Sequence, residues 1–162
     1  MGRKSNAAEP ARLPSDAMGS DLYFAYGSNL CADRLRERAP SAHECGAACA
    51  RGFELRLDKR GADGTAKANL HAAPRGLVWG ALYALDREDW KRLDGFERGY
   101  ARIEIEVALA DGERRALAQT YRSDQLTDAA AADWYKQLIV AGARAHGLPA
   151  DWCAWLDGLP AR

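Results

Sequence analysis

The chain of 162 residues is 48% hydrophobic and 28% charged, a balance typical of one globular domain with a buried core. Its 23 basic and 23 acidic residues cancel, so charge indicates neither a nucleic-acid partner nor an acidic membrane surface. No segment is apolar over the length of a membrane span, and the polar N-terminus lacks the features of a secretory signal. We therefore expect neither nucleic-acid nor membrane partners.

The four cysteines follow no spacing typical of a metal site, and no Cys-x-x-Cys pair is present. We expect reduced thiols, as in a cytoplasmic protein. The three histidines are scattered without ligand spacing, which favours ordinary surface or hydrogen-bonding roles. The sequence therefore predicts a cytoplasmic location and no bound metal.

Residues 1–20 combine prolines, alanines and scattered charges without periodicity, which predicts a disordered extension before a single domain over residues 21–162. Residues 22–26 are apolar throughout, as expected for a strand covered on both faces. A helix over residues 30–38 follows, with Asn29 as its predicted N-cap and Pro40 ending it.

Strands are predicted in the middle of the chain and helices at its end. Clean alternation of apolar and charged residues over 100–109, followed by Asp111-Gly112, predicts a hairpin. The expected strands cover residues 45–57 (broken near Gly52), 67–71, 77–85, 100–109 and 115–121, and the expected helices begin at Asp86, Ala130 and Pro149. In the helix over residues 130–145, Trp134, Leu138, Ile139 and Ala141 are predicted to face the core. The fold class is α+β, with a small mixed β-barrel or curled sheet flanked by helices.

The end of the first strand is the best candidate for contact with a small polar ligand. Its apolar run ends abruptly in Gly27-Ser28-Asn29. Glycine lets the backbone approach a ligand closely, and backbone N–H groups at such a turn can face an anion or a carbonyl. Ser28 and Asn29 add side-chain donors and acceptors. No Gly-x-Ser-x-Gly elbow surrounds Ser28, so we expect it to bind rather than attack.

An acidic segment, Leu93-Asp94-Gly95-Phe96-Glu97-Arg98-Gly99-Tyr100, lies about seventy residues further on. A lone loop glutamate is usually solvated, and Asp94 has the alternative of capping local backbone. The two segments together carry more information than either alone.

The ordered set of motifs resembles the γ-glutamylcyclotransferase family. It comprises Tyr-Gly-Ser-Asn-Leu at the first strand end, Val78-Trp79-Gly80, the Leu-Asp-x-x-Glu segment with its tyrosine, Trp134-Tyr135-Lys136-Gln137-Leu138-Ile139, Gly142-Ala143 and Gly147-Leu148-Pro149. The resemblance covers residues 21–157 and points to the branch that acts on γ-glutamyl amino acids, because the glutathione-specific relatives usually lack the Asn after Gly-Ser.

The resemblance implies an intramolecular reaction that needs neither metal nor cofactor. The α-amine of a γ-glutamyl substrate attacks its own γ-carbonyl, which gives 5-oxoproline and a free amine. Glu97 is the expected general acid and base, since a carboxyl placed between the two nitrogens can take one proton and return one. A homodimer is also implied. The expected substrate-binding residues are Tyr23, Tyr26, Gly27, Ser28, Asn29, Tyr100, Tyr121 and Tyr135. For the tyrosines, a core aromatic with a satisfied hydroxyl remains an equal alternative.

The chain departs from the family pattern directly after the acid. Only Arg98 and Gly99 separate Glu97 from Tyr100, and Arg98 stands where the family often has glycine. The leaving amine is left open, because its contacts are expected from loops such as residues 59–76. A cyclotransferase acting on γ-glutamyl amines, or a non-catalytic module that binds γ-glutamyl metabolites, are the alternatives.

Overall fold

The computed structural model describes residues 20–162. The predicted extension over residues 1–20 falls outside that range except for Ser20, which belongs to the first strand. The elements in chain order are β1 (Ser20–Ala25), η1 (Ser28–Leu30, a 3₁₀ turn), α1 (Ala32–Arg38), β2 (His43–Arg60), β3 (Ala66–Asp86), α2 (Arg87–Phe96), β4 (Ala101–Leu109), β5 (Arg115–Arg122), α3 (Asp133–Ala145) and α4 (Ala150–Asp157).

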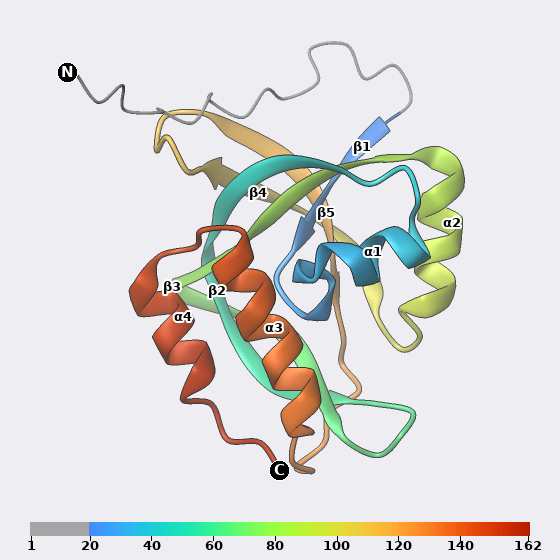
Figure 1. Cartoon of the computed structure of the whole chain (residues 1–162), viewed down its shortest axis with the longest axis vertical. Helices are drawn as coiled ribbons and strands as arrows, with labels where there is room; N and C mark the ends of the chain where they lie inside the picture. Colours follow the sequence, from blue (N-terminus) through green and yellow to red (C-terminus); the bar gives the residue numbers. More distant parts are fainter. Residues whose placement is uncertain (1–19) are drawn as a thin grey trace, which may run out of the picture.

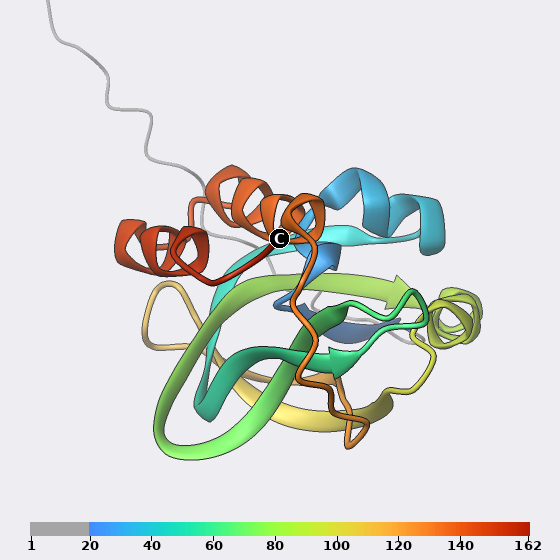
Figure 2. The same cartoon turned by 90° about the horizontal axis from the view of Figure 1, so that it is seen from below.

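The five strands close into a barrel in the order β1-β3-β2-β4-β5. β1 runs antiparallel to β3 and meets β5 through one parallel pair, Tyr23 with Gln119. Figures 1 and 2 show α1, α3 and α4 over one side of the barrel, with α2 at another edge. The predicted α+β barrel with flanking helices is confirmed. Within residues 20–162, no helix combines the length and apolar character needed to cross a bilayer.

The long β2–β3 hairpin corrects the prediction of several short strands. Residues 67–71 and 77–85 belong to one strand of 21 residues, and only residues 61–65 remain as a turn. The expected break near Gly52 is a register shift between Arg51 and Phe53 within a continuous β2. Such bulges let long strands coil around a barrel without ending, and they reset the alternation on which sequence assignment relies.

The prediction of Asn29 as a helix N-cap is wrong. Residues 28–30 form the η1 turn, α1 begins at Ala32, and Cys31 is its N-cap without a side-chain capping bond. The Asn29 side chain is therefore free for contacts away from its own backbone.

The helix predicted to begin at Ala130 begins at Asp133, and its buried face is rotated from the predicted one. Trp134 and Ala141 are exposed, whereas Tyr135 and Val140 are buried. Lys67 lies over the Trp134 ring, 5.0 Å from its centroid, which gives this surface indole a partner.

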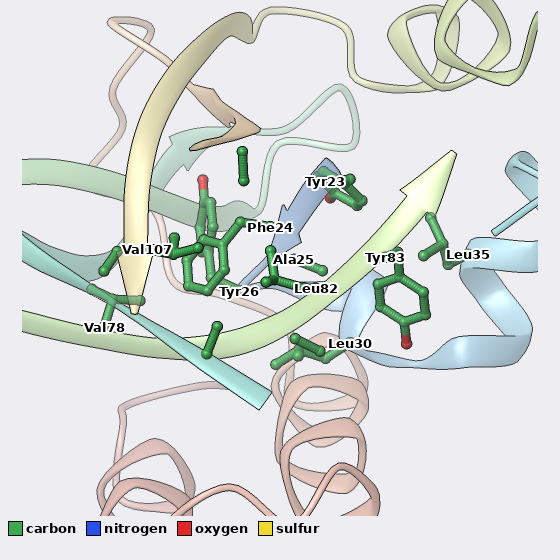
Figure 3. Close-up of a cluster of buried hydrophobic side chains, with 14 of the residues drawn as sticks. Tyr23, Phe24, Ala25, Tyr26, Leu30, Leu35, Val78, Leu82, Tyr83 and Val107 are labelled. Atoms are coloured by element: carbon green, nitrogen blue, oxygen red, sulfur yellow. The ribbon is translucent and has the colours of Figure 1, made fainter. Parts of the chain in front are cut away.

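The buried hydrophobic residues form one cluster that extends from the barrel interior toward the helices. Figure 3 shows Phe24, Tyr26 and Val107 gathered inside the barrel, while Leu30, Leu35 and Tyr83 lie toward α1 and α3. Residues 81–85 of β3 are all buried because both faces of the strand are covered. This packing fixes the end of β1, from which the polar turn projects.

Candidate active site

A small cavity opens where β1 ends. Its space is about 290 Å³, mouth included, at the small end of ligand pockets. It is lined by Tyr23, Tyr26, Gly27, Ser28, Asn29, Ala68, Glu97, Tyr100, Tyr121 and Tyr135. All nine residues predicted from the sequence therefore meet around one cavity, and Ala68 is the single addition.

Glu97 is positioned by the turn after β1, across 68 residues of sequence. Asn29 Nδ2 donates to Glu97 Oε1 at 2.8 Å and to the Tyr23 hydroxyl at 3.0 Å. Oε2 accepts no hydrogen bond from residues 20–162, so it can exchange protons with a molecule in the cavity. The Glu97 side chain is only 14% exposed.

The electrostatic surroundings of Glu97 act in opposite directions. Burial raises the pKa of the Glu97 carboxyl above its ordinary value. The Arg38 guanidinium, 3.6 Å from Oε1, lowers that pKa, as do the Asn29 amide and Lys59. A buried acid with cations nearby can both accept and return a proton near neutral pH.

The turn after β1 approaches β3 so closely that a side chain at Gly27 would be crowded. A Cβ on Gly27 would lie 3.1 Å from the Ala68 Cβ and 3.7 Å from the Tyr135 hydroxyl. The first N–H groups of a helical turn have no partner within the turn, which leaves those of Ser28 and Asn29 available at η1. The turn therefore offers donors at the wall of the cavity that Glu97 also lines.

Hydrogen bonding divides the five tyrosines into two groups. Tyr26, Tyr100 and Tyr121 use their hydroxyl protons within the protein, donating to the Tyr121 carbonyl, the Ala68 carbonyl and the Asp94 carboxylate at 2.6 Å each. These three serve as walls of the cavity.

Tyr23 and Tyr135 keep a proton to donate. The Tyr23 hydroxyl accepts from Asn29, and the Tyr135 hydroxyl accepts from the Ala68 N–H at 2.9 Å. Burial raises the pKa of Tyr135 to about 12 and that of Tyr23 further, so both stay neutral donors. These two are the tyrosines able to bind a substrate oxygen.

The short loop after α2 is anchored by hydrogen bonds to the carbonyls of both residues between Glu97 and Tyr100. Lys59 Nζ donates to the Arg98 carbonyl at 2.7 Å, and the Ser123 hydroxyl donates to the Gly99 carbonyl at 2.6 Å. Gly99 has φ +80°, a conformation that side chains with a Cβ rarely adopt. The loop therefore holds Glu97 rigidly although it is short.

Histidines and acids do not assemble a metal centre. Across residues 20–162, no group of three or more His, Cys, Asp or Glu side chains could hold an ion. His146 has a hydrogen-bonding role, as predicted: it contacts the Leu30 carbonyl at 2.9 Å and the Tyr83 hydroxyl at 2.8 Å, and so ties α3 to η1.

Known proteins are similar to this chain in sequence and in structure. The AIG2-like family matches residues 77–156. The γ-glutamylcyclotransferase of Mus musculus is 32% identical over 142 residues, spanning 81% of this chain and 74% of the mouse protein. The human enzyme of that name is 31% identical over 153 residues, spanning 85% of this chain and 79% of its own. The chain belongs to the γ-glutamylcyclotransferase family.

The fold is that of a γ-glutamylcyclotransferase as well. A solved γ-glutamyl cyclotransferase superposes with a TM-score of 0.82 at 29% identity, covering 88% of this chain and 89% of that one. Membership of the γ-glutamylcyclotransferase family therefore rests on most of the chain, well beyond the motifs at the cavity.

Three residues at the γ-glutamylcyclotransferase-like site gave no signal in the sequence. Arg38 lies at the end of α1, Lys59 at the end of β2 and Ala68 in β3, outside every motif. Only tertiary packing brings them to Glu97. An arginine without a motif or a lysine in a strand is indistinguishable from a surface residue until its partners are known.

Proposed function

We propose that this chain is a γ-glutamylcyclotransferase that converts a γ-glutamyl amino acid into 5-oxoproline and the free amino acid. The hydrogen bond between Asn29 and Glu97 is the observation that carries the proposal, because it joins a substrate-holding turn to an acid across one cavity. Family membership and the fold support the same reaction.

Glu97 is the proton carrier of the proposed reaction. An α-ammonium must lose a proton before it attacks, and Glu97 Oε2 is the available acceptor. The new bond joins the α-nitrogen to the γ-carbon, and the amide bond to the leaving nitrogen breaks. Glu97 returns its proton to that nitrogen, so the carboxylate is regenerated. The ring nitrogen loses its second proton as the lactam forms, and the more basic released amine takes that proton up and leaves as an ammonium.

The turn at residues 27–29 folds the substrate for ring closure. Its N–H groups and the Tyr135 hydroxyl are suited to the α-carboxylate and to the oxygen that becomes negative as the ring forms. Orientation of this kind can supply about 7–11 kcal/mol. The closely packed walls leave the substrate little freedom to adopt other conformers.

Two further predictions concern the cellular location and the oligomeric state of the protein. Free thiols at all four cysteines are consistent with the proposed cytoplasmic location. The homodimer stays a prediction that light scattering of the purified chain would test.

Replacing Glu97 with Gln tests the proposed role of the acid. The Gln side chain keeps the volume and can still contact Asn29, but it cannot carry the proton, so kcat should fall by about 100- to 10,000-fold. 5-Oxoproline released from γ-glutamyl-L-alanine is measured by mass spectrometry. Glu88→Gln, at an exposed site on α2, is the control and should match the wild type.

Two outcomes would contradict the proposal. Wild-type turnover by Glu97→Gln would remove Glu97 from the chemistry. Calorimetric binding of γ-glutamyl-L-alanine by the wild-type chain without any 5-oxoproline would instead favour the non-catalytic binding module.

A further inference from the structure

Lys59 is a buried ammonium without a carboxylate partner. Its side chain belongs to a residue only 6% exposed, and its one hydrogen bond is to the Arg98 carbonyl. The ammonium also lies 4.6 Å from the centroid of the Tyr100 ring. Within residues 20–162 no acid comes within ion-pair distance of it. Buried lysines are normally paired, so this arrangement needs a reason.

A second lysine faces Lys59 across the hairpin. Lys59 and Lys67 are register partners in β2 and β3, and like charges in that position destabilise a sheet. Lys67 is neutralised by Asp63, whose Oδ2 is 3.1 Å from its Nζ. The uncompensated charge of the pair is therefore that of Lys59.

Lys59 lies where a leaving group would emerge from the catalytic cavity. Tyr100 lines that cavity and also a neighbouring hollow, which Gly99 and Ser123 border. Lys59 lines neither hollow itself but contacts two residues that border them: its Nζ lies 4.6 Å from the Tyr100 ring centroid and would be 3.0 Å from a Cβ on Gly99. In a γ-glutamyl amino acid the second carboxylate is two bonds from the departing nitrogen, hence close to the boundary beside Glu97.

The charge balance around Glu97 fits a substrate with two carboxylates. Arg38, Lys59 and Arg34 all act electrostatically on this single acid. Among residues 20–162, Arg34 has no hydrogen-bond or ion-pair partner, and its Nε is buried. A γ-glutamyl amino acid brings two carboxylates and one ammonium to this positive surplus, whereas a γ-glutamyl amine brings only one carboxylate.

We propose that Lys59 is a specificity-determining residue whose ammonium binds the carboxylate of the leaving amino acid. This rests on the proposed cyclotransferase function and adds the residue that selects amino acids over amines as leaving groups. The bond to the Arg98 carbonyl orients the ammonium and couples its position to the loop that carries Glu97.

A pair of substrates that differ only in that carboxylate tests the proposal. γ-Glutamyl-L-alanine and γ-glutamyl-ethylamide give the same 5-oxoproline, measured by mass spectrometry as kcat/KM. In Lys59→Met, kcat/KM for the alanine substrate should fall about 10- to 100-fold, the range expected for a lost hydrogen bond to a charged group. The value for the ethylamide should stay within about threefold.

Matched variants separate charge from loop support. Lys67→Met removes the opposite lysine, which Asp63 already neutralises, and should leave the ratio of the two substrates unchanged. Lys59→Arg should keep most of the preference for alanine. Lys59→Gln retains an N–H donor for the Arg98 carbonyl but has no charge, so it should lose the preference for alanine as Lys59→Met does. It replaces Lys59→Met in the test if the methionine variant does not fold.

Equal losses on both substrates in Lys59→Met and Lys59→Gln would show that Lys59 only supports the loop, and would overturn the proposal. An unchanged ratio would overturn it too. If the wild-type chain released 5-oxoproline from neither substrate, the cyclotransferase function itself would be refuted.

Discussion

At the scale of single residues, burial and nearby positive charge act in opposite directions on the pKa of Glu97. Burial raises the pKa of its carboxyl and so disfavours the charged form. Arg38 and Asn29 contact the same oxygen, Oε1, and stabilise the carboxylate. This leaves Oε2 for proton transfer. Burial therefore raises the proton affinity of the acid, and one arginine and one amide from outside the acidic motif limit that rise.

Replacing Arg38 with Met should shift the pH dependence of the reaction. Arg38 lowers the pKa of Glu97, so its loss lets that pKa rise further above the ordinary value. The base form then appears only at higher pH, and the acidic limb of the kcat/KM profile moves upward. Activity at pH 6 relative to pH 8 should fall by up to about fivefold, as for a partly exposed ion pair.

The control for Arg38→Met is Arg36→Met on the same helix, whose side chain is exposed. Its acidic limb should coincide with that of the wild type. A limb that stays in place or moves to lower pH in Arg38→Met would contradict the assigned coupling between Arg38 and Glu97.

At the scale of elements, the site depends on how closely α3 packs on the η1 turn. A Cβ on Gly142 would lie 2.6 Å from the Leu30 backbone, so the helix can sit there only because this residue is glycine. The same helix carries Tyr135 to the cavity and His146 to the Leu30 carbonyl. The distance between α3 and η1 therefore sets the distance between Tyr135 and the turn.

Gly142→Ala should push α3 away from η1. We expect a loss of about 1–3 kcal/mol in unfolding free energy, as for overpacked sites, and a lower kcat/KM. Urea unfolding measures the first effect. Gly95→Ala in α2, where a Cβ meets no atom within 4 Å, should instead raise stability by about 0.5–1 kcal/mol. Equal stability of Gly142→Ala and the wild type would show that the contact relaxes without cost.

The sequence identifies elements where one periodicity runs uninterrupted. β1 was recognisable as a continuous apolar run, and β4 and β5 by alternation and the Asp111-Gly112 turn. Residues 73–76 of β3 have no register partner in β2, and this interruption makes one long strand read as two in the sequence. The predicted buried face of α3 is wrong because the apolar Trp134 lies on the surface beneath Lys67. Lys67 is distant in sequence, so this contact is not evident from the helix alone.

At the scale of the molecule, the candidate site exists only because the barrel closes. Motifs identified the nine predicted residues, but their meeting requires β1 to sit between β3 and β5. Arg38 and Lys59 reach Glu97 through that closure alone, which is why sequence reasoning missed them. Closure is a long-range property that local periodicity does not report.

Side chains reinforce the seam between β1 and β5, which has a single parallel backbone pair. The Thr120 hydroxyl donates to the buried Phe24 carbonyl at 2.7 Å, and the Tyr26 hydroxyl donates to the Tyr121 carbonyl at 2.6 Å. These bonds satisfy backbone groups that a fuller ladder would have paired. The seam lies directly beside the candidate cavity, whose lining includes Tyr23, Tyr26 and Tyr121.

Thr120→Val should therefore weaken closure without changing side-chain shape. The Phe24 carbonyl would lose its donor in a buried position, which costs about 1–3 kcal/mol of unfolding free energy. Thr127→Val, at a partly exposed loop site, should change stability by at most about 0.5 kcal/mol. Denaturant unfolding compares the two, and hydrogen exchange should accelerate first in β1 and β5 of Thr120→Val. Uniform acceleration over all strands would mean that the barrel opens as one unit and that the seam is no weaker than the rest.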